Sequence, residues 1–259
     1  MLVAAAGLSV IPGAFGAITS CPSSPSLLGL TTYLGSGNGC STVDATYTNF
    51  SVGTATGTIN GVALPGASTV LIPSALQIFL ATEPSNPRLL EFSSPGLLGP
   101  TSQNGCSNIS GDLGWCIQGK NDVLVSSYTY TATFSNAIST FGIAGTALAN
   151  GGVSTATVFR EICLGQATFS QGCANYLVVQ GGAVNTNFSS LSFSSSVNFA
   201  PTNVIAIRDT VYLATANPNS SWATFLPYDT IDSPEPATFG IMGAALAALG
   251  FARRRRKRS

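Results

Sequence analysis

The sequence predicts an all-β fold: an antiparallel β-sandwich with disulfide-stapled loops, and one apolar helix at each end of the chain. Three observations support this. First, side chains alternate between apolar and polar along many segments. Second, these strand-like segments are short and are separated by Gly, Pro, Asn and Ser. Third, the number of cysteines is even. Charged residues are only 8% of the 259 residues, against about 25% in ordinary soluble proteins. The chain is long enough for one large domain or two small ones, with enough residues for a core.

The alternation is clearest in segment 126–134, where Tyr128, Tyr130 and Phe134 share one face and threonines share the other. This period of two indicates a strand with one buried face. Segment 138–152 is apolar enough for a helix. Because it contains Gly142 and Gly145, its sequence is equally compatible with a strand or a loop. Further strands are expected at residues 42–52, 75–83, 87–93, 154–163, 175–180, 190–199 and 203–214.

Six cysteines in a chain with this composition indicate disulfide bonds. Their order suggests local pairs, although six cysteines allow fifteen connectivities and the sequence does not select one. No pair has the C-x-x-C spacing of a zinc site, and we expect no metal and no cofactor. The suggested pairs are Cys21 with Cys40, Cys106 with Cys116, and Cys163 with Cys173.

The N-terminus has the anatomy of a secretory signal peptide, which we place at residues 1–17. An apolar run is followed by Pro12 and Gly13 and then by a small-x-small site at Ala14-Phe15-Gly16. A buried N-terminal helix is the alternative. A second alternative is a lipoprotein signal, since Ile18 to Cys21 loosely fits a lipobox, but lipidation of Cys21 would leave five cysteines.

The C-terminal segment 233–259 combines an uncharged run with a cluster of basic residues. Residues 237–252 carry no charge, and as a helix they would be about 24 Å long, which is short but workable for a bilayer. The cations hold their end of such a helix in the cytoplasm and leave residues 18–232 outside. They are Arg253, Arg254, Arg255, Arg256, Lys257 and Arg258.

The whole segment resembles the PEP-CTERM sorting signal, because the triplet Pro234-Glu235-Pro236 precedes the apolar span and the terminal basic cluster. The resemblance implies an exported protein of a Gram-negative bacterium, held transiently in the inner membrane until an exosortase processes it near the triplet. The product then reaches the cell surface or the extracellular matrix. A simple membrane anchor is the alternative. The tail is sometimes given an ice-binding label, but a sorting tail does not imply ice binding.

The charges outside the tail argue against nucleic acid as a partner. Before Pro234 there are four basic and nine acidic residues, a net charge of −5, whereas phosphate binding requires clustered Lys and Arg. Histidine is absent, which removes the commonest general base and the commonest zinc ligand.

Carboxylate pairs are the remaining route to catalysis, because two of them can hydrolyse a glycosidic bond without histidine. None of the candidates lies in a recognisable motif, and Asp112 lacks the spacing of a calcium loop. We therefore expect no catalytic residues and no enzymatic activity. The pairs considered are Asp112 with Asp122, Glu83 with Glu91, and Glu161 with Asp209.

Aromatic side chains could stack on sugar rings if they were exposed. The candidates are Trp115, Trp222, Tyr128, Tyr130 and Tyr228, which we expect mostly in the core. The sequence thus predicts an exported surface or matrix protein with a structural or adhesive role linked to exopolysaccharide or biofilm. The alternatives are a carbohydrate-binding module for exopolysaccharide and, less favoured, a histidine-free glycoside hydrolase or lyase.

Overall fold

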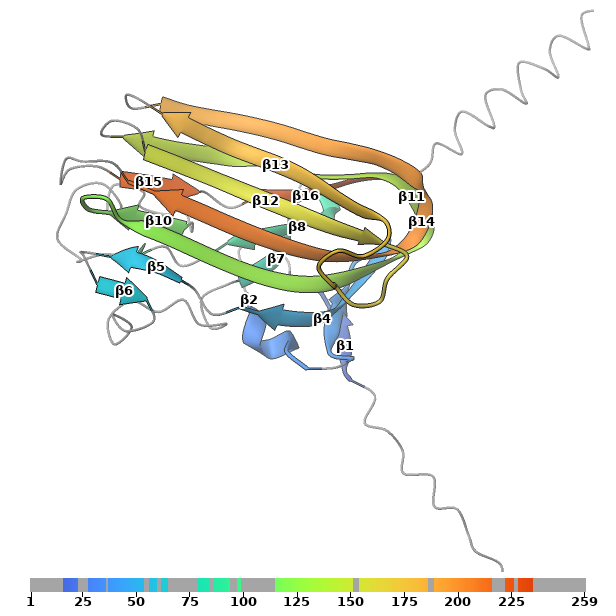
Figure 1. Cartoon of the computed structure of the whole chain (residues 1–259). Coiled ribbons are helices and arrows are strands. Elements are labelled where there is room, and N and C mark those ends of the chain that lie inside the picture. Colours follow the sequence, from blue (N-terminus) through green and yellow to red (C-terminus); the bar gives the residue numbers. More distant parts are fainter. Residues whose placement is uncertain are drawn as a thin grey trace, which may run out of the picture.

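The structure, a computed structural model, is built almost entirely of β-strands (Figure 1). It describes residues 16–22, 28–35, 37–53, 56–59, 62–64, 79–83, 86–93, 97–98, 115–150, 154–185, 189–215, 222–225 and 228–234. The elements in chain order are β1 (Ile18–Ser20), β2 (Leu28–Gly29), the 3-10 turn η1 (Leu30–Tyr33), β3 (Gly39–Ser41), β4 (Ala45–Val52), β5 (Thr56–Ile59), β6 (Val62–Leu64), β7 (Phe79–Glu83), β8 (Asn86–Ser93), β9 (Leu97–Leu98), β10 (Trp115–Gln118), β11 (Val123–Asn150), β12 (Ser154–Leu164), β13 (Tyr176–Asn185), β14 (Ser189–Ala214), β15 (Trp222–Phe225) and β16 (Tyr228–Pro234).

Two long strands, β11 and β14, organise the domain. They pair with each other antiparallel along most of their length, and the register shifts between Thr133 and Thr140 of β11. Both strands bend at this place and continue into a second layer, as Figure 1 shows at one end of the molecule. Irregular pairing of this kind increases local bending, so the same two strands serve both layers.

The first layer contains the first half of β11 and the second half of β14. On the β14 side it continues through β12 to β13, and on the β11 side it continues to β4, β3 and β1 and to the β5–β6 hairpin. The second layer contains the other halves of β11 and β14, followed by β16, β8, β7 and β2. Strands β15, β10 and β9 join the second half of β11 as a side branch.

Aromatic side chains fill the space between the layers. The Phe92 ring of β8 lies 4.8 Å from Tyr128 and 5.1 Å from Tyr130, both on the first half of β11. Phe50 of β4 stacks on Tyr130. These rings are almost completely buried, so the alternating face predicted for segment 126–134 is the inward face of the first layer.

The all-β prediction is confirmed, but the described strands form one hydrogen-bonded sheet folded into two layers, not the two separate sheets of the expected sandwich. Segments 190–199 and 203–214, expected as two strands, are both parts of β14. Pro201 does not break this strand, because it lies between the paired residues Asn198 and Thr202 and no ladder bond requires its missing N–H.

Segment 138–152, for which the sequence allows a helix, a strand or a loop, is strand up to Asn150. Gly142 is required there by close packing: a Cβ at this position would lie 2.2 Å from the Ser195 carbonyl oxygen of β14. Gly142 therefore permits close strand approach, and neither Gly142 nor Gly145 marks a turn, since both lie within β11.

Of the predicted signal peptide at residues 1–17, residues 1–15 lie outside the described residues, and the predicted membrane span at residues 237–252 lies entirely outside them. The last signal-peptide residue, Ala17, is described and contacts the folded domain, because its carbonyl oxygen accepts a hydrogen bond from the Gly39 N–H at 3.2 Å. Within the described part of the chain, no helix has the length and apolar character needed to cross a membrane.

Candidate functional site

Strands β12 and β14 carry two ion pairs side by side, and the two face opposite sides of the sheet. Arg160 is directly opposite Asp209, and the next residue pair in register is Glu161 opposite Arg208. Because successive residues of a strand point to opposite faces, the first pair points between the layers and the second points outward. We call them the inner pair and the outer pair.

The inner pair is completely buried, with 0% side-chain exposure for both residues. Arg160 donates from Nε to Asp209 Oδ1 at 2.8 Å and from Nη2 to Oδ2 at 2.6 Å, and Tyr128 donates its hydroxyl proton to Oδ2 at 2.9 Å. Arg160 Nη1 also donates to the Gly142 carbonyl oxygen of the second layer. The guanidinium lies 5.1 Å from the Phe141 ring centre. The inner pair therefore bridges the two layers.

Tyr130 lies next to the inner pair, and burial raises its pKa well above the usual value, while the Arg160 charge opposes that shift. Its phenol stays protonated at any physiological pH. Arg160, Asp209 and Tyr128 form a hydrogen-bonded structural network in the core, and Tyr130 lies beside it. Substrate cannot reach these groups, because each of the four residues is at most 1% exposed.

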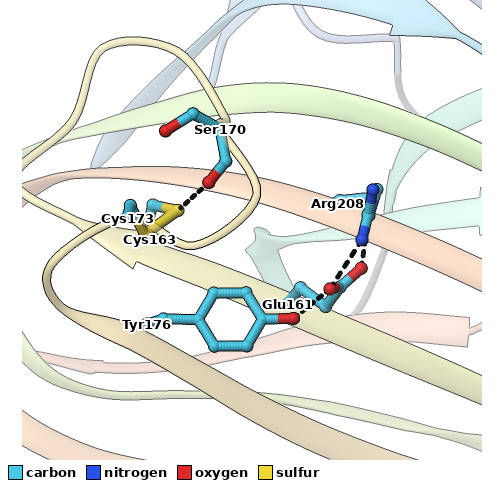
Figure 2. The surroundings of a disulfide bond; sticks show 6 residues. All are labelled: Glu161, Cys163, Ser170, Cys173, Tyr176 and Arg208. Atoms are coloured by element: carbon cyan, nitrogen blue, oxygen red, sulfur yellow. Dashed lines mark hydrogen bonds and ion pairs between the residues drawn. A yellow bond between two sulfur atoms is a disulfide. The ribbon is translucent and has the colours of Figure 1, made fainter.

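The outer pair forms a surface cluster with two aromatic side chains, Tyr176, which Figure 2 shows beside the pair, and Phe169. Arg208 donates from Nη2 to Glu161 Oε1 at 2.7 Å and from Nε to Oε2, and the Tyr176 hydroxyl of β13 donates to Oε1. The Arg208 guanidinium lies 4.8 Å from the centre of the Phe169 ring. We call Glu161, Arg208, Tyr176 and Phe169 the outer cluster.

The electrostatics of the outer cluster favour its charged form. Burial alone would raise the pKa of Glu161, but the hydrogen bonds from Arg208 and Tyr176 lower it below the usual value. Burial and the hydrogen bond to Glu161 raise the pKa of Tyr176. The hydrogen bond to Glu161 raises the pKa of Arg208. A carboxylate held in this way is a poor general acid, because it is ionised at neutral pH.

The loop 165–175 covers part of the outer face next to this cluster. The Cys163–Cys173 disulfide closes it at its base (Figure 2). The Ala167 carbonyl oxygen accepts hydrogen bonds from Thr131 Oγ1 at 2.7 Å and from Asn49 Nδ2 at 3.1 Å. Cys163 Sγ lies 3.3 Å from the Ser170 carbonyl oxygen, a packing contact, because a disulfide sulfur carries no proton to donate.

A β-bulge in β4 supplies one of these loop anchors. Asn49 has a positive φ of 55°, and the β4–β11 register shifts between Thr129 and Thr131 at this point. Asn tolerates this left-handed conformation better than most residues. The bulge thereby turns the Asn49 amide toward the loop.

Two of the three suggested disulfides are present. Cys21 bonds to Cys40 with 4.7 Å between the Cα atoms, and Cys163 bonds to Cys173 with 6.0 Å. Cys106 lies outside the described residues, and of Cys116 only the strand backbone in β10 is described.

The carboxylate pairs do not assemble into a site among the described residues. Glu161 and Asp209 point to opposite faces of the sheet, and each is held by its own arginine. Asp122 is completely buried, and its backbone N–H donates to Thr215 Oγ1. Asp112 and the side chains of Glu83 and Glu91 lie outside the described residues. No group of three metal-ligating side chains occurs in the described part of the chain.

The aromatic candidates follow the expectation of a core role where they are described. Trp115, Tyr128 and Tyr130 are at most 2% exposed. The side chains of Trp222 and Tyr228 lie outside the described residues. Tyr176 and Phe169, which are not among the predicted aromatic candidates, are the aromatic residues of the outer cluster. Their position depends on the predicted Cys163–Cys173 disulfide and also on the β12–β13 pairing, which the local sequence does not display.

The sorting tail follows the folded domain without a spacer. Strand β16 ends at Pro234, which is opposite Ile138 of β11, and Ser233 is opposite Thr140. A family model for the PEP-CTERM protein-sorting motif matches residues 234–257. The C-terminal tail of this chain is a PEP-CTERM sorting motif. This motif implies export, a membrane-anchored sorting intermediate and processing by an exosortase.

The other comparisons assign no family or role to the residues before the PEP-CTERM tail. No curated protein matches the sequence. Among solved structures, the carbohydrate-binding module TmCBM61 in complex with β-1,4-galactotriose matches 48% of this chain and 74% of its own, with 8% identity and a TM-score of 0.25. The enzymatically active domain of bacteriophage CBA120 tailspike protein 4 matches 55% of this chain and 19% of its own, with 12% identity and a TM-score of 0.23. At these scores neither likeness carries an argument about fold or function.

Proposed function

We propose that this chain is a surface or matrix protein that an exosortase releases from its membrane anchor next to Pro234-Glu235-Pro236. The observation that carries the proposal is the PEP-CTERM motif at residues 234–257, which begins at the last residue of the final strand. In this proposal residues 237–252 span the inner membrane, and residues 253–258 remain in the cytoplasm until processing.

The exported domain has a structural or adhesive role in this proposal and acts by binding, not by catalysis. Two features support it. The acids Glu161 and Asp209 are each neutralised by an arginine, and the two described disulfides suit an oxidising compartment outside the cytoplasm.

The test compares processing in cells. The full chain is expressed in a host with its exosortase and in the same host without it, and the mass of the product is measured with an antibody against the domain. Replacing Pro234, Glu235 and Pro236 with alanine should leave a full-length product in both hosts. The matched control, Asp232→Asn, should be processed like the native chain. A native chain of unchanged mass in the exosortase host, or equal processing without the enzyme, contradicts the proposal.

A second candidate is binding of exopolysaccharide on the outer face of β12–β14. The observation that favours it is the outer cluster, where the 37% exposed Tyr176 stands next to the ion pair and Phe169 packs on Arg208. Exposed aromatic rings beside fixed polar groups suit sugar rings.

The second candidate is tested by co-sedimentation of the full chain with the producer's polysaccharide. Tyr176→Ala should reduce the bound fraction, because it removes the exposed ring. Val43→Ala changes a residue that is 77% exposed on the β3–β4 turn and should have no effect. Equal binding by the two variants, or no binding by the native chain, excludes this candidate.

A further inference from the structure

One side of the domain presents two long strand edges. Within the described residues, β13 pairs only with β12, and the first half of β14 pairs only with β11. The two edges lie side by side in different layers (Figure 1), and the Phe193 ring of β14 packs against Gly181 of β13. The outermost strands elsewhere are short: three residues in β1 and β6, and two in β2 and β9.

The β13 edge lacks the features that normally prevent strand pairing between molecules. It is ten residues long, it contains no charged residue and no proline, and its register with β12 is continuous from Asn185 to Tyr176. Residues 189–200 of β14 are also uncharged. Proteins that remain monomeric usually place charges, prolines, bulges or very short strands at such edges.

The hydrogen-bond pattern identifies which backbone groups face away from the domain. Leu164 N–H donates to the Asn175 carbonyl oxygen at 3.1 Å, and these two residues continue the register of the β12–β13 pair. Since hydrogen-bonded and non-hydrogen-bonded pairs alternate in an antiparallel ladder, Leu177 and Val179 bond to β12. The N–H and C=O groups of Tyr176, Val178 and Gln180 therefore point to the open edge.

Side chains at this side are also incompletely covered. Val178 is 50% exposed. Phe193, Val197 and Phe199 of β14 contact the core but remain only partly buried. A partner that extended the sheet here would cover these side chains and satisfy the edge backbone groups at the same time.

We propose that two copies of this chain associate through β13, edge to edge and antiparallel, with the first halves of β14 brought to the same interface. A second copy fits because a two-fold axis perpendicular to the layer keeps inward residues such as Val179 opposite inward residues and outward residues such as Val178 opposite outward ones. No like charges meet, because neither edge carries a charge. This deepens the structural role proposed above.

The test is the mass of the full chain in mild detergent, measured by sedimentation over a range of concentrations. The native chain should form dimers, and Val178→Pro should raise the dimer dissociation constant about tenfold or more, because it removes an edge N–H on both copies and leaves the β12 ladder intact. The matched control Val178→Thr keeps the N–H and the strand preference, and its dissociation constant should stay close to the native value.

A second measurement does not depend on the folding of a variant. In the native chain, hydrogen exchange at the amides of Val178 and Gln180 should slow as concentration rises, whereas the Val179 amide should be protected at every concentration. A monomeric native chain, an unchanged Val178→Pro dimer, or edge amides that exchange independently of concentration would overturn the inference. Sorting is measured by processing in cells, so either proposal can fail without the other.

Discussion

The inner and outer pairs are a natural comparison, because they join the same two strands at consecutive positions and lie on opposite faces of the sheet. Arg160 and Asp209 are completely buried, whereas Arg208 and Glu161 retain 28% and 12% side-chain exposure. Both are bidentate arginine–carboxylate pairs with a tyrosine hydroxyl as an additional donor. The two pairs thus have nearly the same hydrogen-bonding chemistry but differ in their exposure to solvent.

The difference in burial determines how much each pair contributes to the stability of the protein. Removing one partner of a buried pair leaves an unpaired charge in the core, which is strongly destabilising. An exposed pair loses little when it is broken, because water solvates the remaining charge. We expect the inner pair to hold the two layers together and the outer pair to shape the surface near loop 165–175.

The largest effect should come from breaking the inner pair. Arg160→Met should lower the free energy of unfolding by about 3–5 kcal/mol, because it leaves the buried Asp209 carboxylate without the opposite charge of its arginine. The double variant Arg160→Met/Asp209→Leu should recover most of this loss, since no charge then remains. Urea unfolding of the full chain measures both.

The matched control for the inner pair is Arg208→Met, one position away on β14. It should cost no more than about 1 kcal/mol. If Arg208→Met and Arg160→Met were equally destabilising, burial would not be what distinguishes the two pairs.

The alternation of side chains between the two faces of β14 determines which features of the inner pair could be predicted from the sequence. Alternation in segment 203–214 places Asp209 on the face of Ile205 and Ile207, and an acid on an apolar face needs a cationic partner. The sequence does not show which arginine that is, because Arg160 is 49 residues away and the β12–β14 register decides the match. For the same reason Glu161 and Asp209 could be considered as a pair, although they lie on opposite faces.

Local patterns also predicted the all-β class and two short-range disulfides, because alternation and nearby cysteines act over a few residues. They did not predict the folded-over sheet. One bent strand and two separate strands have the same period of two, and Pro201 lies at the bend, where proline ordinarily indicates a break.

A smaller effect is expected from the loop that borders only the outer pair. The double variant Cys163→Ser/Cys173→Ser removes a link between residues ten apart, and the entropic model gives a loss of about 2–3 kcal/mol. Because Phe169 of this loop packs on Arg208, the pKa of Glu161 should also move toward its usual value. Urea unfolding and carboxyl NMR titration measure the two effects.

Cys21→Ser/Cys40→Ser is the control for the loop variant, since this disulfide lies at β1 and β3. It should destabilise the chain without changing the Glu161 titration. An unchanged Glu161 pKa in the Cys163→Ser/Cys173→Ser variant would show that the loop does not support the outer cluster.

The smallest effect should come from Glu161→Gln, and it should depend on pH. Since the pKa of Glu161 is lower in the folded protein than its usual 4.5, the ionised carboxylate stabilises the fold fully above that value, and this contribution is lost as pH falls through the lowered pKa. At pH 7 the free energy of unfolding of the native chain should exceed that of Glu161→Gln by no more than about 1 kcal/mol, because the pair is partly exposed. The two should become equally stable in acid. A difference that is the same at pH 7 and in acid would mean that Glu161 stabilises the outer face by packing and not by its charge, and the contrast with the inner pair would then rest on geometry alone.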